Sequence, residues 1–177
     1  MEKADIRKQM RELKRQLTPE EKLRRSEAVM RQVEQLPEFC KARVVLMYWS
    51  MADEVQTHAF VERWHREKTV LLPCVDGDDL RLRQYTGPEC LVAGEQFGIG
   101  EPTGPEWTDL EAVELIVVPG VAFDLRNNRM GRGRGFYDRL LKSTPRAVKV
   151  GVAYGFQLLD KIPVEAFDVP MNLVIHD

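Results

Sequence analysis

At Val44-Val45-Leu46-Met47-Tyr48-Trp49 the chain has a short, continuous apolar run that is rich in strand-forming residues. A helical pattern that includes Phe60 and Trp64 follows it, and residues 69–74 form a second apolar run. Two buried strands joined by an amphipathic helix are typical of a right-handed βαβ unit, in which parallel strands are covered by helices. We therefore predict an α/β protein.

Elements on both sides extend this pattern. Upstream, apolar residues at helical spacing predict a helix over 3–17, and Thr18-Pro19 predicts the N-cap and first position of a second helix that ends at Leu36-Pro37. Downstream, the predicted strands cover 80–85, 115–118, 148–153 and 173–175, with a helix over 136–141 and a long surface connection over 87–109. No repeat or linker divides the chain, so residues 1–177 are expected to form a single domain.

Composition excludes several classes of protein. The chain has 177 residues, with 26 Lys and Arg against 28 Asp and Glu, and a net charge of −2, so a nucleic-acid coat protein is not expected. No apolar stretch is long enough to span a membrane and the start lacks a signal sequence, which favours a cytoplasmic monomer without membrane or nucleic-acid partners. Cys40, Cys74 and Cys90 are odd in number and form no CxxC pair, so we expect buried free thiols.

Charge is distributed unevenly along the chain. Residues 1–32 carry 10 basic and 6 acidic side chains, and residues 126–149 carry 8 basic and 1 acidic. The 33–125 stretch between them carries 7 basic and 17 acidic side chains. A fold that brought the two basic segments together would create a local anion site in a nearly neutral molecule.

The segment Gly131-Arg132-Gly133-Arg134-Gly135 has the composition of an anion-binding loop. Glycines permit positive φ angles and a close approach of backbone N–H groups to an anion, and the predicted helix that follows adds its N-terminus. Arginines supply forked donors for phosphate oxygens. The segment matches neither the Walker nor the dinucleotide-binding spacing, and a flexible turn or an RGG-like nucleic-acid segment remain alternatives.

Three charged residues are further candidates. Asp138 is the single carboxylate within residues 126–149, and one or two such groups commonly hold a divalent cation that bridges phosphates. A local ion pair with Arg139 or Arg134 is the alternative. Lys3 and Arg7 stand about one turn apart on the first helix, where they could also be part of a solvated face.

These residues carry a resemblance to a known family. The strings Pro119-Gly120-x-Ala122-Phe123-Asp124 and Arg129-Met130-Gly131-Arg132-Gly133-x-Gly135-Phe136-Tyr137-Asp138-Arg139 resemble the signature of the 5-formyltetrahydrofolate cyclo-ligases, also called methenyltetrahydrofolate synthetases. The other matching pieces are Lys3-x-x-Ile6-Arg7, Ser50-Met51-x-x-Glu54-Val55-x-Thr57, Phe97-Gly98-Ile99-x-Glu101-Pro102, Gly151-Val152-Ala153-Tyr154 with Gln157, and Asp168-Val169-Pro170. The resemblance covers nearly the whole chain.

The resemblance implies a three-layer α/β/α fold with a mostly parallel sheet. It also implies an ATP- and Mg²⁺-dependent closure of 5-formyltetrahydrofolate to 5,10-methenyltetrahydrofolate, with release of ADP and phosphate. In that family the formyl oxygen attacks the γ-phosphate, and N10 of the folate closes on the resulting iminium phosphate. Such chemistry asks the protein for positioning and charge neutralisation rather than for a nucleophile.

The family's site residues transfer to matching positions of this sequence. The resemblance implies that ATP is held by Lys3, Arg7, Arg129, Met130, Gly131, Arg132, Gly133, Arg134, Gly135, Phe136 and Tyr137. It implies that folate is contacted by Trp49, Glu54, Arg132, Gly133, Arg134, Gly135 and Phe136. The implied catalytic residues are Arg132, Arg134 and Tyr137, and the implied metal ligands are Asp138 and Asn172.

Three positions depart from the family pattern. Arg134 stands where members carry Gly or Lys, and Asn127 replaces a glycine in a turn, where asparagine tolerates left-handed geometry. Asn172 stands where many members have an aspartate, and its neutral carbonyl is a weaker metal ligand. Two alternative functions stay open: another ATP-dependent enzyme on the same scaffold, and a non-catalytic anion or nucleic-acid binding domain that uses the basic helix and the Gly/Arg loop.

Overall fold

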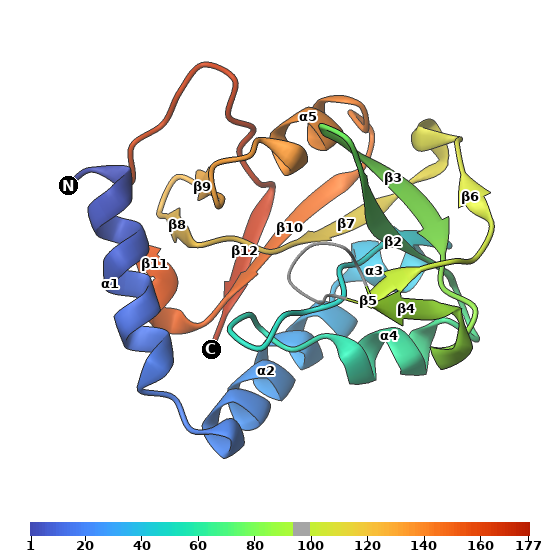
Figure 1. Ribbon diagram of the computed structural model, residues 1–177, viewed down its shortest axis with the longest axis horizontal. Helices are drawn as coiled ribbons and strands as arrows, with labels where there is room; N and C mark the ends of the chain where they lie inside the picture. Colours follow the sequence, from blue (N-terminus) through green and yellow to red (C-terminus); the bar gives the residue numbers. More distant parts are fainter. Residues whose placement is uncertain (94–99) are drawn as a thin grey trace.

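A seven-stranded sheet forms the centre of the computed structural model, which describes residues 1–93 and 100–177 (Figure 1). Its strands, in spatial order, are β12 (Leu173–His176), β10 (Val148–Ala153), β7 (Leu115–Val118), β1 (Val44–Leu46), β2 (Thr69–Asp76), β3 (Asp79–Gln84) and β6 (Glu106–Trp107). Neighbours from β12 to β2 pair in parallel, whereas β3 pairs antiparallel with β2 and β6. The predicted mostly parallel α/β sheet is confirmed.

The βαβ unit that began the sequence argument is present. Strand β1 leads through α4 (His58–Trp64) to β2, and Val45 lies opposite Val70 in the parallel register. Strand β1 is shorter than the apolar run predicts, although the backbone N–H of Met47 still donates to the Leu71 carbonyl over 2.8 Å. The chain beyond Met47 leaves the sheet and is free to line a site at its edge.

Helices lie on both faces of the sheet, which gives the three layers expected. Helices α2 (Pro19–Glu34), α3 (Pro37–Lys41) and α4 share one apolar cluster with the sheet, and α5 (Phe136–Lys142) packs in the cluster on the opposite face. Helix α1 (Lys3–Arg15) follows the predicted span and packs on a small second sheet through Ile6 and Met10. The predicted N-cap is also present, because Thr18 Oγ1 accepts from the Glu21 N–H over 3.1 Å.

The connections between the main strands contain more structure than the sequence indicates. A three-stranded sheet of β11 (Leu158–Leu159), β8 (Ala122–Asp124) and β9 (Arg129–Met130) was not predicted. The prediction of a plain surface connection over 87–109 was wrong, because that stretch contains η1 (Pro88–Cys90), β4 (Leu91–Ala93), β5 (Gly100–Pro102) and β6. Two further 3₁₀ turns are η2 (Leu110–Ala112) and η3 (Gly155–Gln157). Strands of two or three residues carry too little periodicity to be recognised. The motif piece Phe97-Gly98-Ile99 lies outside the described residues.

The cysteines follow the prediction only in part. All three are free thiols, but Cys90 alone is buried, while Cys74 is partly exposed and Cys40 is exposed at the end of the short helix α3. Helix α3 packs on the core through one face that carries Phe39, and Cys40 lies on the exposed side. Among the described residues, none of the helices combines the length and apolar character that crossing a membrane requires.

Asp124 anchors the turn between β8 and β9. Its buried carboxylate accepts hydrogen bonds from the backbone N–H groups of Arg126, Asn128 and Ile162 and from the Asn128 side chain, at 3.0 to 3.2 Å. Burial acts to raise the pKa of Asp124, but these hydrogen bonds outweigh it and the pKa is lowered. Asn127 in this turn has a φ of 65°, the left-handed geometry that asparagine tolerates.

Asp124→Asn is expected to lower the free energy of unfolding by about 1–3 kcal/mol, because an amide N–H₂ would face two hydrogen-bond donors. The carboxylate's contribution is present at neutral pH and is lost as the pH falls through the lowered pKa, so wild type and variant should converge in acid. Urea unfolding across pH measures this. Asp160→Asn, at an exposed position, is the control and should change little. A constant difference at all pH values would contradict the assignment.

Candidate active site

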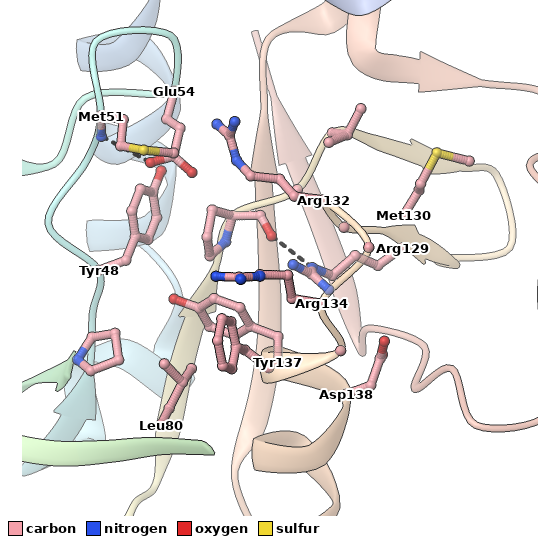
Figure 2. A pocket seen from close by; sticks show the side chains of 18 of the residues that line it. Tyr48, Met51, Glu54, Leu80, Arg129, Met130, Arg132, Arg134, Tyr137 and Asp138 are labelled. Atoms are coloured by element: carbon pink, nitrogen blue, oxygen red, sulfur yellow. Dashed lines mark hydrogen bonds between the residues drawn. The ribbon is translucent and has the colours of Figure 1, made fainter. Parts of the chain in front are cut away.

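A cavity of about 460 Å³ lies at the carboxyl ends of β1 and β7 (Figure 2). The chain leaves β1 toward β2 on one side and leaves β7 toward β10 on the other, so the two connections diverge. Tyr48 follows β1, Pro119 follows β7, and both line the cavity. Open parallel sheets bind ligands at such points, where the strand order reverses.

The Gly/Arg loop, residues 131–135, forms one wall of this cavity. It connects β9 to α5, and Gly133 and Gly135 have φ angles of 106° and 71°, which other residues rarely adopt. Gly135 is also the N-cap of α5. Gly131 is not left-handed, but a Cβ there would lie 3.1 Å from the Arg129 guanidinium. The prediction of positive φ is confirmed for two of the three glycines.

The structure brings nearly all sequence-predicted site residues to this one cavity. They come from α1, the segment after β1, β9, the Gly/Arg loop and the start of α5. The lining includes Lys3, Arg7, Trp49, Glu54, Arg129, Met130, Gly131, Arg132, Gly133, Arg134, Gly135, Phe136, Tyr137 and Asp138. Asn172 is not among the lining residues. The two basic segments therefore meet, as the charge distribution suggests.

Helix α1 is fastened to the Gly/Arg loop. The Arg7 guanidinium donates to the Gly131 carbonyl through Nε at 3.3 Å and through Nη2 at 3.2 Å. Lys3 Nζ lies 3.1 Å from the Glu165 carboxylate, on the segment that precedes β12. Both cations thus reach the cavity from the same helix face, and Lys3 already has an exposed carboxylate as its partner.

Arg129 and Tyr137 support the loop from below. Arg129 is buried, its Nε donates to the Pro119 carbonyl over 2.6 Å, and its guanidinium lies 4.9 Å from the centre of the Tyr137 ring. Burial lowers the pKa of Arg129 and raises the pKa of the Tyr137 phenol. Tyr137 is therefore a neutral hydrogen-bond donor at physiological pH, and Arg129 places positive charge under the cavity floor.

The opposite wall is the segment 50–57, which hydrogen bonds hold in one shape. Glu54 Oε1 accepts from the Met51 N–H over 2.9 Å, and the Tyr48 hydroxyl donates to the Val55 carbonyl over 2.7 Å. Burial raises the pKa of Glu54, while the Met51 N–H and the nearby Arg132 oppose the shift. Figure 2 shows Arg132 extending from the loop toward this carboxylate.

Trp49 borders the cavity with its ring already packed. The indole stacks on His58 with ring centres 3.8 Å apart and planes inclined by 8°. A Cβ at Gly100 would lie 3.2 Å from Cδ1 and Nε1 of the indole, so Gly100 leaves room for that edge. Because His58 covers one face of the ring, stacking of a flat ligand on that face would require His58 to move.

Two carboxylates line the cavity near the start of α5. Asp138 Oδ1 accepts from the Val169 N–H over 3.2 Å, which ties α5 to the segment that carries Asp168. Arg139, the alternative partner of Asp138, instead lies 3.4 Å from Asp79. No role was predicted for Asp168, although the run Asp168-Val169-Pro170, which resembles the family's sequence, was the available signal.

Asn172 has a different environment. Its Oδ1 accepts from the Lys149 N–H over 2.7 Å and thereby joins the chain before β12 to β10. Its assignment as a metal ligand stays a prediction, and the cavity offers Asp168 in its place. Within the described part of the chain, no group of three or more His, Cys, Asp or Glu side chains is arranged to hold a metal ion by itself.

The two walls of the cavity differ in chemistry. Arginines on a glycine-rich loop, at a helix N-terminus and at the crevice of a parallel sheet, suit a phosphorylated ligand. The partly buried carboxylate of Glu54 and aromatic rings face them across the same cavity and suit a flat ligand with N–H donors. The lining therefore combines the chemistry that suits an anionic ligand with the chemistry that suits a flat, polar one.

Comparisons with known proteins show which family the chain resembles. The 5-formyltetrahydrofolate cyclo-ligase of Haemophilus influenzae is 31% identical over 174 residues, covering 94% of this chain and 92% of that protein. The enzyme of the same name from Escherichia coli K12 is 30% identical over 175 residues, covering 94% and 95%. The structure of Aquifex aeolicus 5,10-methenyltetrahydrofolate synthetase superposes with a TM-score of 0.88 at 40% identity, covering 99% and 90%. A methenyltetrahydrofolate synthetase from Mycoplasma pneumoniae, with a TM-score of 0.79 and 23% identity, supports the fold.

The chain belongs to the 5-formyltetrahydrofolate cyclo-ligase family, whose sequence pattern matches residues 1–177. It is therefore an enzyme of the ligase class.

Gly135→Ala should destabilise the protein by about 1–2 kcal/mol, because alanine disfavours the left-handed φ. Gly77→Ala is the matched control: Gly77 has a φ of 62°, lies outside the cavity, and a Cβ there meets nothing within 4 Å. Urea unfolding should show a similar decrease in the free energy of unfolding for the two variants. Calorimetric titration with pyrophosphate should show weaker binding only for Gly135→Ala. Equal binding by both variants would argue against an anion site at this loop.

Proposed function

We propose that this enzyme closes 5-formyltetrahydrofolate to 5,10-methenyltetrahydrofolate at the expense of ATP and with Mg²⁺, releasing ADP and phosphate. The observation that carries the proposal is the cavity itself, in which the Gly/Arg loop faces Glu54 and the aromatic rings after β1. The family membership of the whole chain supports the same reaction.

The phosphates of ATP would lie against the Gly/Arg loop and α1. Lys3, Arg7 and Arg134 line this side of the cavity, and the N-terminus of α5 adds backbone N–H groups. Lys3 would exchange its partner Glu165 for a phosphate oxygen, a small cost because both side chains of the pair are partly exposed. The nucleotide would also be contacted by Met130, Gly133 and Phe136, which line the same cavity.

The folate would lie against the opposite wall. The Glu54 carboxylate accepts hydrogen bonds, and a pterin presents amino and ring N–H donors. Trp49 and Tyr48 would border the pterin, with Trp49 held rigid by His58. This arrangement would direct the formyl oxygen toward the γ-phosphate at the centre of the cavity.

The reaction would proceed by phosphoryl transfer to the formyl oxygen. The terminal P–O bond of ATP breaks as the formyl O–P bond forms, which activates the formyl carbon as an iminium phosphate. N10 then attacks this carbon and loses its proton, and the C–O bond breaks to release phosphate. Arg132 and Arg134 would stabilise the charge on the transferring group, and Tyr137 would act as a neutral donor beside it.

Mg²⁺ would neutralise phosphate charge in this site. The donor set fits, because Asp138 and Asp168 both line the cavity and Mg²⁺ on a nucleotide usually takes only one or two carboxylates from the protein. Arg129 lies near both carboxylates, and their negative charge favours the charged form of its guanidinium. We propose Asp138 and Asp168 as this pair.

The decisive experiment mixes the purified protein with 5-formyltetrahydrofolate, ATP and Mg²⁺ and follows the near-ultraviolet absorbance of the methenyl product. Absence of product from a protein that still binds ATP would favour another ATP-dependent reaction on this scaffold. Strongly salt-dependent oligonucleotide binding without turnover would favour the non-catalytic alternative. A cytoplasmic location and a monomeric state are part of the proposal, and sedimentation tests the latter.

Arg132→Ala should reduce turnover about 100-fold or more, the usual cost of removing one donor to a transition state. Arg126→Ala removes an exposed arginine of the same basic segment outside the cavity and should leave turnover unchanged. Steady-state kinetics with both substrates provide the measurement. Normal turnover by Arg132→Ala would remove Arg132 from its catalytic role.

Asp138→Asn and Asp168→Asn should each raise the Mg²⁺ concentration needed for half-maximal turnover, because an amide carbonyl is a weaker ligand than a carboxylate. Asp160→Asn again serves as the control. A Mg²⁺ titration at fixed ATP distinguishes the variants. An unchanged midpoint for Asp138→Asn would leave it with only its hydrogen bond to the Val169 N–H.

A further inference from the structure

We propose that Asp53 positions Arg132 for phosphoryl transfer and that the buried Lys14 holds Asp53 in place; this inference rests on the proposed function. The three residues come from α1, from the segment after β1 and from the Gly/Arg loop. Arg132 Nη2 donates to Asp53 Oδ1 at 3.1 Å and to Oδ2 at 3.2 Å. Lys14 Nζ lies 4.0 Å from Asp53 Oδ2.

Arg132 needs an external anchor because the loop holds its backbone but offers its long side chain little support. Glycines flank it on both sides, and Gly133 has a φ of 106°. An arginine side chain loses on the order of 2 kcal/mol of rotamer entropy when it is fixed. Arg132 is also half exposed, with 49% of its side chain accessible. Without a partner, its guanidinium would occupy many positions around the mouth of the cavity.

Asp53, in contrast, lies on a rigid segment. Glu54 on one side is fixed by hydrogen bonds to Met51, and further along the Thr57 N–H donates to Ser50 Oγ over 3.0 Å. The Glu54 carbonyl accepts from the Tyr154 hydroxyl over 3.1 Å, which ties the segment to the end of β10. Asp53 is therefore the fixed member of the pair and Arg132 the member that is held.

Lys14 adds a constraint on Asp53 that a surface pair lacks. Only 7% of the Lys14 side chain is exposed, against 41% for Asp53. A buried ammonium group requires a countercharge, and Asp53 is the carboxylate placed within 4.0 Å of it. Burial lowers the pKa of Lys14, and the Asp53 carboxylate is the largest influence that opposes the shift. An exposed Arg132–Asp53 ion pair would by itself do little to restrict the Arg132 side chain. Lys14 restricts the Asp53 carboxylate, which is the acceptor in that pair.

The arrangement places Arg132 near Glu54. Figure 2 shows the Arg132 side chain extended across the cavity mouth, toward the wall that would hold the folate. Such preorganisation removes the cost of ordering the side chain during the reaction. The Asp53 carboxylate is negatively charged and does not attract a phosphate. Its contribution therefore lies in turnover rather than in the affinity for ATP.

Asp53→Asn tests the proposal. We expect kcat to fall about 5- to 10-fold, since small misplacements of a catalytic group cost up to about 100-fold. KM for ATP should stay constant or fall, because the variant removes a negative charge near the phosphates. Asp53→Glu, which keeps the charge, should recover part of kcat. The control is Glu12→Gln, which removes the exposed Glu12–Arg15 pair on α1, the helix that also carries Lys14.

The double variant Asp53→Asn/Lys14→Met separates positioning from stability. Asp53→Asn alone strands a buried charge and should lower the thermal unfolding midpoint, whereas methionine keeps the apolar stem of Lys14 without the charge. The double variant should regain the midpoint while kcat stays low. If Asp53→Asn alone does not fold, kcat of the double variant provides the test of positioning.

Two outcomes would overturn the positioning role. One is wild-type kcat in Asp53→Asn, and the other is recovery of kcat together with stability in the double variant, which would reduce Asp53 to a counterion for Lys14. Both presuppose an active wild-type enzyme. A wild type that forms no methenyl product would instead overturn the proposed function itself, so the two failures are distinguishable.

Discussion

The adjacency of β1 and β7 in the sheet is the constraint on which the rest of the structure depends. The two strands pair in parallel, and their following connections run to opposite sides, one through α4 to β2 and the other through α5 to β10. Right-handed crossovers then place α4 and α5 on opposite faces, so neither covers the carboxyl ends of β1 and β7. The cavity occupies this gap, and its walls are the segments that leave these two strands.

Charge within the site is balanced in pairs rather than left as a bare positive surface. Lys3 faces Glu165 and Arg132 faces Asp53, while buried Arg129 lies near Asp138 and Asp168. The exposed Lys3–Glu165 pair contributes little to stability and can open at small cost when a stronger anion arrives, whereas the Arg132–Asp53 pair is backed by the buried Lys14. The near-neutral composition of the chain thus conceals a cavity at which basic side chains from two separate segments meet.

The fold was predictable from the sequence because its signals are local, whereas Trp49, Glu54 and most roles at the site were implied only by the resemblance to a family. The apolar run after residue 43 and the next one at Thr69–Asp76 fix the βαβ unit, and the glycines around Arg132 mark the loop that lines the cavity. The strands β8, β9 and β11 were not predictable, because two or three residues show no periodicity of their own and β11 forms only by pairing with the distant β8. The same holds for β4 to β6, which a Gly- and Pro-rich composition had indicated as irregular.

The sequence by itself determined the class of fold and the chemistry of the Gly/Arg loop, since hydrophobic periodicity and glycine content act over a few residues. Only the tertiary structure decided which charges meet. It brought Lys14, Asp53 and Arg132 together from three separate segments, and it placed Asp168 in the cavity while engaging Asn172 with Lys149. Such contacts depend on how packed elements orient side chains across the fold, which the spacing of residues along the chain does not record.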